Sequence, residues 1–198
     1  VEKYAVIAEI WRYLIAAKES EILAIPLVDA VDDLPAWVPA GARSLVGFAM
    51  NDGTSAPCRV LSAGRKKMRD EGRRLEGWTE AKRFYAARGV AGIRHWTVTE
   101  GDYTAAPDIV ATWFVDPPYQ RAGVHYKHSS TAIDFPALGS WCRGRSGQVI
   151  ACENVGADWL PFRPFGREQR NPMSNAASRE AIWTSDPPRQ VDMFGGAA

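Results

Sequence analysis

A tetrapeptide with unusual chemical potential, Asp116-Pro117-Pro118-Tyr119, follows directly on the apolar run ATWFV. The Asp116 carboxylate accepts hydrogen bonds. The carbonyl of Pro117 can accept another, because a proline ends the pairing of a strand and leaves this oxygen without a ladder partner. Tyr119 adds a flat aromatic face. Together these groups could hold a planar amine between two acceptors while its ring stacks on the tyrosine.

Two acceptors can also activate such an amine. The exocyclic amine of a nucleobase is a poor nucleophile, because its lone pair is shared with the ring. Hydrogen bonds to two acceptors localise that lone pair and orient it for in-line attack. The base must first leave the duplex, and stacking on Tyr119 would offset part of that cost. The tetrapeptide therefore predicts a site for the amine of an extruded base.

The elements that must position this site form a pattern of strands and a helix. Three apolar runs, 93–103, 108–116 and 147–154, predict buried strands, and residues 132–145 predict a short helix between the last two. Two strands joined by one helix of this length predict a right-handed parallel crossover, and residues 180–186 predict a late antiparallel strand. The tetrapeptide falls at the carboxyl end of a strand, where open α/β sheets bind their ligands.

The first half of the chain is predominantly helical in pattern. Residues 4–18 place apolar side chains at helical spacing and predict a helix, and residues 25–42 read as a connection rich in Pro and Asp. From residue 44 to 91 the pattern is helical but interrupted by glycines. We interpret residues 44–92 as a small helical lobe inserted into an α/β domain that spans residues 1–198.

Composition narrows the class of protein further. Of the 198 residues, 46% are hydrophobic and 24% charged, which is typical of a soluble globular domain, and no apolar run is long enough to span a membrane. The three cysteines, Cys58, Cys142 and Cys152, predict reduced, buried thiols in a cytoplasmic protein. His125 and His128 have no Cys or acid nearby to complete a zinc site, so we expect no metal. Because no apolar run could span a membrane, we also expect no membrane partner.

Charge is unevenly distributed along the chain. The net charge is only +1, yet residues 59–94 hold 11 basic and 4 acidic residues. A local excess of +7 is typical of surfaces that meet phosphates, although a solvated helical face would give the same count. Aromatic residues lie among or just beyond these charges and favour nucleic acid as the partner: Trp78, Phe84, Tyr85 and Trp96.

The tetrapeptide also carries a resemblance to a known family. An Asp-Pro-Pro-Tyr after an apolar strand resembles the catalytic motif of the S-adenosylmethionine-dependent DNA methyltransferases that act on amino groups, and its acidic first residue resembles the adenine-specific members. The flanking blocks resemble the Dam-like enzymes of bacteria and phages: EGDYTAAPDIVATWFVDPPY, YKHSS, IDFPALGSWCRGRSGQVIACENVGADWLPF and EAIWTSD. The resemblance covers most of residues 93–186 and, more loosely, VEKYAVIAEIWRYLI. A second Asp-Pro-Pro, at 186–188, is followed by Arg189 rather than an aromatic ring and predicts only a turn.

The resemblance implies a role for each residue of the motif. Asp116 and Pro117 would hold the target amine, Pro118 would stiffen the motif, and Tyr119 would stack on the flipped adenine. A polar loop, Tyr126-Lys127-His128, would close over the base or touch phosphate, unless it is an ordinary solvated loop. Glu153 and Asn154 end the next strand near the site, where polar strand ends are also common.

S-adenosylmethionine is the cofactor that the resemblance implies. Asp102 resembles the residue that contacts the cofactor's adenine, with Tyr103 packed on it, and Glu2 resembles the acid that binds the ribose hydroxyls. Asp116 would also face the cofactor. The alternatives are a turn acid at Asp102 and a surface acid at Glu2.

The order of the segments adds two expectations. The basic lobe falls where the family places its target-recognition segment, so we expect double-stranded DNA as the partner, with Arg65, Lys66 and Lys67 among the DNA contacts. The family's glycine-containing motif on the first strand has no counterpart in the chain. We therefore expect a partial Rossmann-like sheet without its first strand, in a chain that starts downstream of it and binds S-adenosylmethionine poorly or not at all.

Other activities remain open at this stage. Amino-group methylation of cytosine usually uses a motif that begins with Ser, and protein glutamine methylation one that begins with Asn. Methylation of RNA adenine is a further option. A truncated relative that binds DNA without catalysis is the non-enzymatic alternative.

Overall fold

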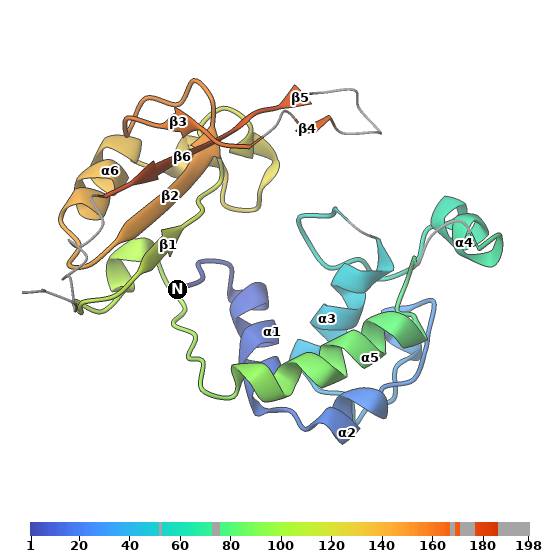
Figure 1. The fold of residues 1–198 in the computed structure, drawn as a ribbon. Helices are drawn as coiled ribbons and strands as arrows, with labels where there is room; N and C mark the ends of the chain where they lie inside the picture. Colours follow the sequence, from blue (N-terminus) through green and yellow to red (C-terminus); the bar gives the residue numbers. More distant parts are fainter. Residues whose placement is uncertain (52, 73–75, 167–168, 171–176, 186–198) are drawn as a thin grey trace, which may run out of the picture. The chain divides into compact units, whose positions relative to one another are not determined.

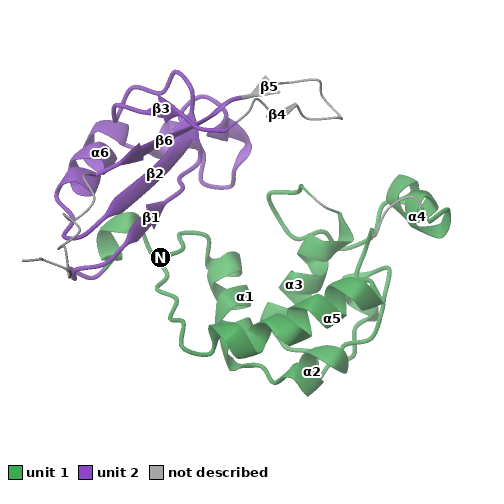
Figure 2. Cartoon of the chain, in the orientation of Figure 1, with its two compact units in different colours: residues 1–106 green, residues 107–198 purple. Residues whose placement is uncertain are grey.

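Helices and strands are segregated along the chain. The computed structural model of the protein describes residues 1–51, 53–72, 76–166, 169–170 and 177–185. Helices α1 to α5 lie in its first half, and the described strands lie in its second half together with α6 (Figure 1). These halves form two compact units, residues 1–106 (unit 1) and 107–198 (unit 2) (Figure 2). The fold is therefore mixed α/β, as predicted, and each unit is described separately.

Unit 1 is a helical unit, and its longest helix is the one that the sequence predicts most directly. Its helices are α1 (Ala5–Ala16), α2 (Glu19–Leu23), α3 (Ala40–Met50), α4 (Ala63–Asp70) and α5 (Glu80–Gly89). Helix α1 confirms the prediction for residues 4–18. It packs closely on α3, because Gly41 has no side chain: a Cβ there would lie 2.7 Å from the Cβ of Tyr13.

One hydrophobic core runs through unit 1. Buried side chains from the N-terminal part, such as Ile22 and Ile25, share it with Val46, Met50 and Trp78 from the segment that we interpret as an inserted lobe. Residues 44–92 therefore fold against the helices that precede them in sequence, within the same compact unit.

The predicted strand at residues 93–103 is not formed as a strand. The segment begins at the end of a 3-10 turn, Val90–Ile93, and continues as extended chain with a single parallel bridge, between Glu2 and Glu100. The bridge is made by the Glu2 N–H, which donates to the Thr99 carbonyl, and by the Gly101 N–H, which donates to the Glu2 carbonyl. An extended run becomes a strand only where a neighbour pairs with it along its length, and the partner offers one residue here.

Unit 2 contains a four-stranded mixed sheet. Its order is β1 (Trp113–Val115), β2 (Val149–Asn154), β6 (Glu180–Thr184) and β3 (Arg163–Pro164). Strands β1 and β2 are parallel and are connected through α6 (Phe135–Arg143), whereas β6 is antiparallel to β2. The predicted parallel strand–helix–strand unit and the late antiparallel strand are confirmed. A small separate pair is formed by β4 (Gln169–Arg170) and β5 (Ala177–Ser178).

The strand before the tetrapeptide is shorter and more exposed than its apolar sequence suggests. Among the described strands, β1 pairs with β2 alone, so the prediction that this run is buried is wrong for Val110 and Phe114, which are 81% and 69% exposed. Its pairing begins beside Gly147, which has a φ of +96° and lies so close to Ala111 that a Cβ would meet the Ala111 oxygen at 2.1 Å. Only glycine combines that conformation with that approach.

Strand β2 alternates between buried and half-buried positions. Val149, Ala151 and Glu153 lie on its buried side, as period-two geometry requires. The three cysteines carry free thiols, but only Cys142 of α6 is buried, and this burial raises its pKa to about 11. The prediction of burial is wrong for Cys58 and Cys152, which are half-buried. No helix among the described residues is long and apolar enough to cross a membrane.

Candidate functional site

The Asp-Pro-Pro-Tyr motif begins immediately after β1, as the sequence predicts. Asp116 follows Val115, the last residue of the strand, and is exposed, whereas Pro117, Pro118 and Tyr119 are half-buried. The loop reaches the carboxyl end of β2 (Figure 1). There, the Gln120 N–H donates to Glu153 Oε2. The motif is therefore accessible to a ligand. The second Asp-Pro-Pro, at residues 186–188, lies outside the described residues.

The aromatic ring of the motif is held by its hydroxyl. Tyr119 Oη donates a 2.9 Å hydrogen bond to Oε2 of Glu180, the first residue of β6. Burial, the hydrogen bond to Glu180 and the nearby negative charges raise the pKa of Tyr119 well above its usual range, so the phenol stays protonated and acts as the donor. A hydroxyl bond of this kind lies in the plane of the ring and does not use the aromatic faces.

Asp116 lies in an acidic environment. Loss of hydration raises the pKa of its carboxyl group. The charge of Glu180 also raises it, while the nearby polar hydroxyl of Tyr119 lowers it in part. The pKa of the neighbouring Cys152 thiol is raised by burial first and then by these two carboxylates. Asp116 is therefore a better proton acceptor than an isolated aspartate, because a higher pKa means a more strongly held proton.

A buried carboxylate fixes the backbone of the motif loop. Glu153 is 0% exposed, and its Oε2 accepts a 2.8 Å hydrogen bond from the Gln120 N–H and a 3.1 Å bond from Trp159 Nε1. Its Oε1 accepts from the Asn154 N–H at 2.9 Å. The sequence alone predicts Glu153 near the site without indicating its partners. The alternating burial of β2 is the signal that points its side chain inward.

Further contacts tighten the same loop. The Gln120 side chain donates to Asp158 Oδ1 at 2.9 Å and accepts from the Asp158 N–H at 3.3 Å. The Gly123 N–H bonds to the Tyr119 carbonyl at 2.6 Å, and a Cβ on Gly123 would lie 2.6 Å from the Pro118 carbonyl carbon. The motif is thus held by contacts to β2, to β6 and to the loop after β2. The sequence alone does not predict Glu180, Asp158 and Gln120 as site residues, because no local pattern indicates which distant residue each of them contacts.

The acids proposed for the cofactor lie together in unit 1. The bridge between Glu2 and Glu100 aligns two parallel extended segments, and Asp102 follows the second of them. Lys3 Nζ contacts Asp102 Oδ2 at 2.7 Å, and this hydrogen bond is the main cause that lowers the pKa of Asp102. Glu2 Oε1 accepts a 2.7 Å bond from the Tyr4 N–H. Tyr103 begins a short 3-10 turn directly after Asp102.

The remaining predicted substrate contacts of unit 2 lie in the loop after the motif. Tyr126, Lys127 and His128 are exposed and follow the 3-10 turn Gly123–His125. The described residues contain no group of three or more His, Cys, Asp or Glu side chains placed to hold a metal ion.

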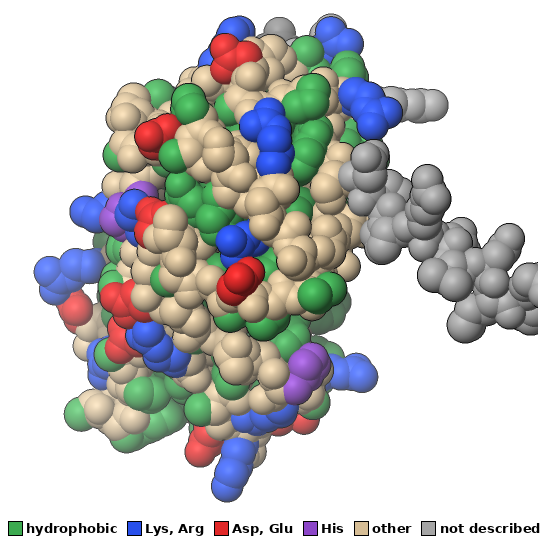
Figure 3. Space-filling model, turned by 90° about the vertical axis from the view of Figure 1, so that its left-hand side faces the viewer, with side chains coloured by type: hydrophobic (Ala, Val, Ile, Leu, Met, Phe, Trp, Pro, Cys, Tyr) green, Lys and Arg blue, Asp and Glu red, His purple; other side chains and the backbone are tan. Residues whose placement is uncertain are grey.

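The basic residues that we expected to contact DNA form ion pairs within unit 1. Arg65 Nη1 lies 2.7 Å from Oε2 of Glu76, whose side chain is only 1% exposed. Lys66 pairs with Asp29 at 2.9 Å, and Lys67 lies 3.8 Å from Glu71, one helical turn further along. On the face shown in Figure 3, the Lys and Arg side chains are scattered among acidic and hydrophobic ones. Among the described cations of this segment, these three predicted DNA contacts are therefore already engaged in ion pairs.

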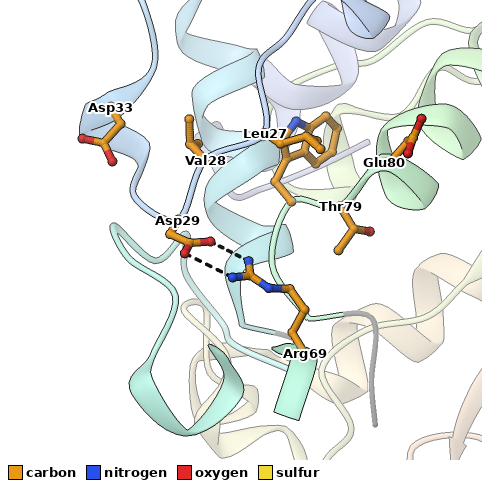
Figure 4. Close-up of a pocket in the computed structure, with 8 residues that line it drawn as sticks. Leu27, Val28, Asp29, Asp33, Arg69, Thr79 and Glu80 are labelled. Atoms are coloured by element: carbon orange, nitrogen blue, oxygen red, sulfur yellow. Dashed lines mark hydrogen bonds and ion pairs between the residues drawn. The ribbon is translucent and has the colours of Figure 1, made fainter. Parts of the chain in front are cut away.

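An open hollow of about 530 Å³ lies elsewhere in unit 1 (Figure 4). Asp29 and Arg69 form a two-bond ion pair on its wall, with Arg69 Nη1 2.5 Å from Asp29 Oδ1. Trp78 and Leu27 supply its apolar side. None of the residues that we assign to the motif lines this hollow.

The resemblance to amino-group DNA methyltransferases rests on the Asp-Pro-Pro-Tyr motif and its flanking segments. No protein-family model, no curated protein and no solved structure matches the chain.

Proposed function

We propose that this protein is an S-adenosylmethionine-dependent DNA methyltransferase that acts on the exocyclic amine of an extruded adenine. The observation that carries the proposal is the accessible Asp116-Pro117-Pro118-Tyr119 loop at the carboxyl end of a parallel strand, anchored by Glu153 and Glu180. Open α/β sheets bind ligands at such strand ends. A rigid acceptor pair beside a fixed ring is the arrangement that an amino-group transfer requires.

The residues of the motif have distinct tasks in this reaction. The Asp116 carboxylate and the Pro117 carbonyl accept the two N–H groups of the amine and direct its lone pair away from the ring. Tyr119 stacks on the base, with its orientation fixed through Glu180. When bound, S-adenosylmethionine would supply a methyl group on a sulfonium, and the rest of the cofactor would be a neutral thioether after the transfer. Asp116 receives the proton that the amine releases, and its raised pKa suits this task.

Two acids in unit 1 fit an adenosine. Glu2 forms the single parallel bridge with Glu100, two residues before Asp102, and the lowered pKa of Asp102 keeps it ionised as an acceptor. We propose that Glu2 holds the ribose hydroxyls, that Asp102 accepts from the adenine amine and that Tyr103 packs on the ring. Carboxylates are suitable acceptors for both kinds of donor.

Double-stranded DNA is the substrate that we propose. The target-recognition role of residues 44–92 also remains a proposal, but the ion pairs change which residues can test it. Reversing the charge of Arg65 would put a second negative charge beside the buried Glu76 carboxylate and destabilise the unit. Lys67, with 76% of its side chain exposed, is the appropriate site for testing contact with phosphate.

Substitution of Asp116 tests the function directly. We expect Asp116→Ala to lower methyl transfer at least about 100-fold, since an acceptor and a proton acceptor are lost together. Methylated DNA is digested to nucleosides, and the base that has gained the mass of a methyl group is identified by mass spectrometry. Adenine is the expected base; cytosine would instead support the alternative amino-group activity.

The second Asp-Pro-Pro of the chain provides a matched control. Asp186→Ala removes the same side chain from the same tripeptide without its aromatic neighbour, and we expect it to leave methyl transfer unchanged. Equal transfer by wild type and Asp116→Ala would contradict the mechanism. Absence of transfer by wild type, with retained DNA binding, would favour the non-catalytic relative.

A further inference from the structure

A fully buried acid in unit 2, Glu153, forms a hydrogen bond with the main chain of the motif loop. Glu153 is fully buried, and all three of its hydrogen bonds come from N–H donors on three segments: the motif loop, its own strand end and the loop after β2. No lysine or arginine in the described part of the chain forms an ion pair with it. Burying a carboxylate is costly unless donors surround it, so the position of these donors defines what this residue does.

The donor supplied by the motif is restricted by its sequence. Pro117 and Pro118 have no N–H, and each fixes its own φ. Gln120 supplies the N–H that Glu153 binds, only one residue after the tyrosine. Fixing this single amide therefore sets the position of the two prolines and of the Tyr119 backbone relative to β2.

The ring of Tyr119 is then fixed at both ends. The amide of the next residue, Gln120, donates to Glu153 and so holds the backbone beside Tyr119. The Tyr119 hydroxyl donates to Glu180 at 2.9 Å. These anchors come from neighbouring strands, β2 and β6, which pair along five residues from Ile150 to Asn154. The sheet therefore sets the distance between the anchors, and neither anchor uses the faces of the ring.

We propose that Glu153 is a positioning residue for the methyl-transfer site, an inference that rests on the proposed function. It holds the Gln120 amide and through it the Pro117 carbonyl and the Tyr119 ring, and it does not touch the base. Displacing catalytic groups by about 1 Å can cost on the order of 100-fold in rate. Loss of this anchor consequently lowers the rate of transfer more than the affinity for DNA.

The decisive variant is Glu153→Met, which has a similar length and no acceptor oxygen. We expect hydrogen exchange at the Gln120 amide to become at least about 10-fold faster. We expect kcat for methyl transfer to fall about 30-fold, with KM for DNA changed less than about threefold. Glu153→Gln restores one acceptor oxygen, so its exchange rate and kcat should lie between those of Glu153→Met and wild type.

Two controls separate positioning from general stability. Gln120→Ala removes the side-chain bonds to Asp158 but keeps the amide that Glu153 binds, so kcat should fall much less than in Glu153→Met. Trp159→Phe removes the other donor to the same Glu153 oxygen and lowers the melting temperature without speeding exchange at Gln120. If Glu153→Met does not fold, Glu153→Gln is used for the same two measurements.

Each outcome decides the proposal. Unchanged exchange at Gln120 in the Glu153 variants would overturn it, and so would faster exchange with an unchanged kcat on DNA. If the wild-type chain transfers no methyl group, the proposed function fails, and the exchange of the Gln120 amide alone then decides whether Glu153 holds the loop.

Discussion

In unit 1, basic side chains donate hydrogen bonds to backbone carbonyls, whereas in unit 2 carboxylates accept the hydrogen bonds that hold the motif loop. In unit 1, Arg43 donates to the carbonyls of Val31, Val38, Leu34 and Pro35. In unit 2, the principal anchors are carboxylates that accept: Glu153 from N–H groups, and Glu180 from a hydroxyl.

The difference shows that a count of basic residues does not indicate whether they face a ligand or their own unit. Other cations of unit 1 also donate to backbone carbonyls, as Arg43 does: Arg83 donates to the Ile25 carbonyl at 3.0 Å, and Lys82 to the Ala49 carbonyl at 3.1 Å. Guanidinium groups suit this role because they present several donors in a fixed fork. A basic segment can therefore serve the interior of its own unit, and the acids of unit 2 are the charges that shape the candidate site.

The largest effect that we expect concerns the sheet of unit 2. Gly147→Ala forces a side chain into a φ of +96° and against the Ala111 oxygen, so it should destabilise the protein by about 3 kcal/mol or more. Gly64→Ala in α4 is the control, because a Cβ there meets nothing within 4 Å. That variant should be neutral or stabilise by about 0.5–1 kcal/mol. Chemical denaturation measures both, and similar values for the two would refute the register described for β1 and β2.

The next effect tests the cationic anchors of unit 1. Arg43→Met keeps the apolar stem of the side chain but removes the guanidinium donor from four backbone carbonyls, and we expect a loss of about 2–3 kcal/mol in the free energy of unfolding. Arg12→Met removes a cation whose pair with Glu100 is exposed, and should cost less than about 1 kcal/mol. If these two arginine variants unfold at the same denaturant concentration, the claim that Arg43 stabilises unit 1 through its carbonyl partners is contradicted.

The smallest effect that we expect concerns the pH dependence of stability, which should have opposite signs for Asp29 in unit 1 and Asp116 in unit 2. Hydrogen bonds from Arg69 and Lys66 hold the pKa of Asp29 far below its usual range, so its ionised form stabilises unit 1 at neutral pH. This contribution is present above the ordinary aspartate pKa of about 4 and is lost as the pH falls below it. Asp29→Asn should therefore melt below wild type at pH 7, with a gap that closes in acid.

Asp116 in unit 2 should behave in the opposite way. Its pKa is raised, so the folded protein binds this proton more tightly than the unfolded chain, and its ionised form destabilises the fold at neutral pH. Asp116→Asn should melt at or above wild type at pH 7, and the advantage should vanish as the pH falls through the raised pKa. Calorimetry from pH 7 to pH 3 measures both variants, and gaps of the same sign would contradict the contrast between the units.

Local sequence determined the elements around the site. Helical spacing in α1, alternation in β2 and the proline stop after Val115 are properties of neighbouring residues, so they can be read without any tertiary contact. The parallel pairing of β1 and β2 followed from the length of their connection. The position of Asp116 at the end of a strand was predictable for the same reason.

The tertiary structure alone decided what these residues contact. The partner of Gln120 is 33 residues away in sequence, and that of Tyr119 is 61 residues away. The run before Asp102 has the composition of a strand but remains unpaired apart from one bridge, because pairing depends on a neighbour that composition does not specify. Arg65 has the composition of a phosphate ligand but pairs with Glu76. Hydrogen bonds and ion pairs act over a few ångströms in space, and only the folded chain determines which residues come within that distance.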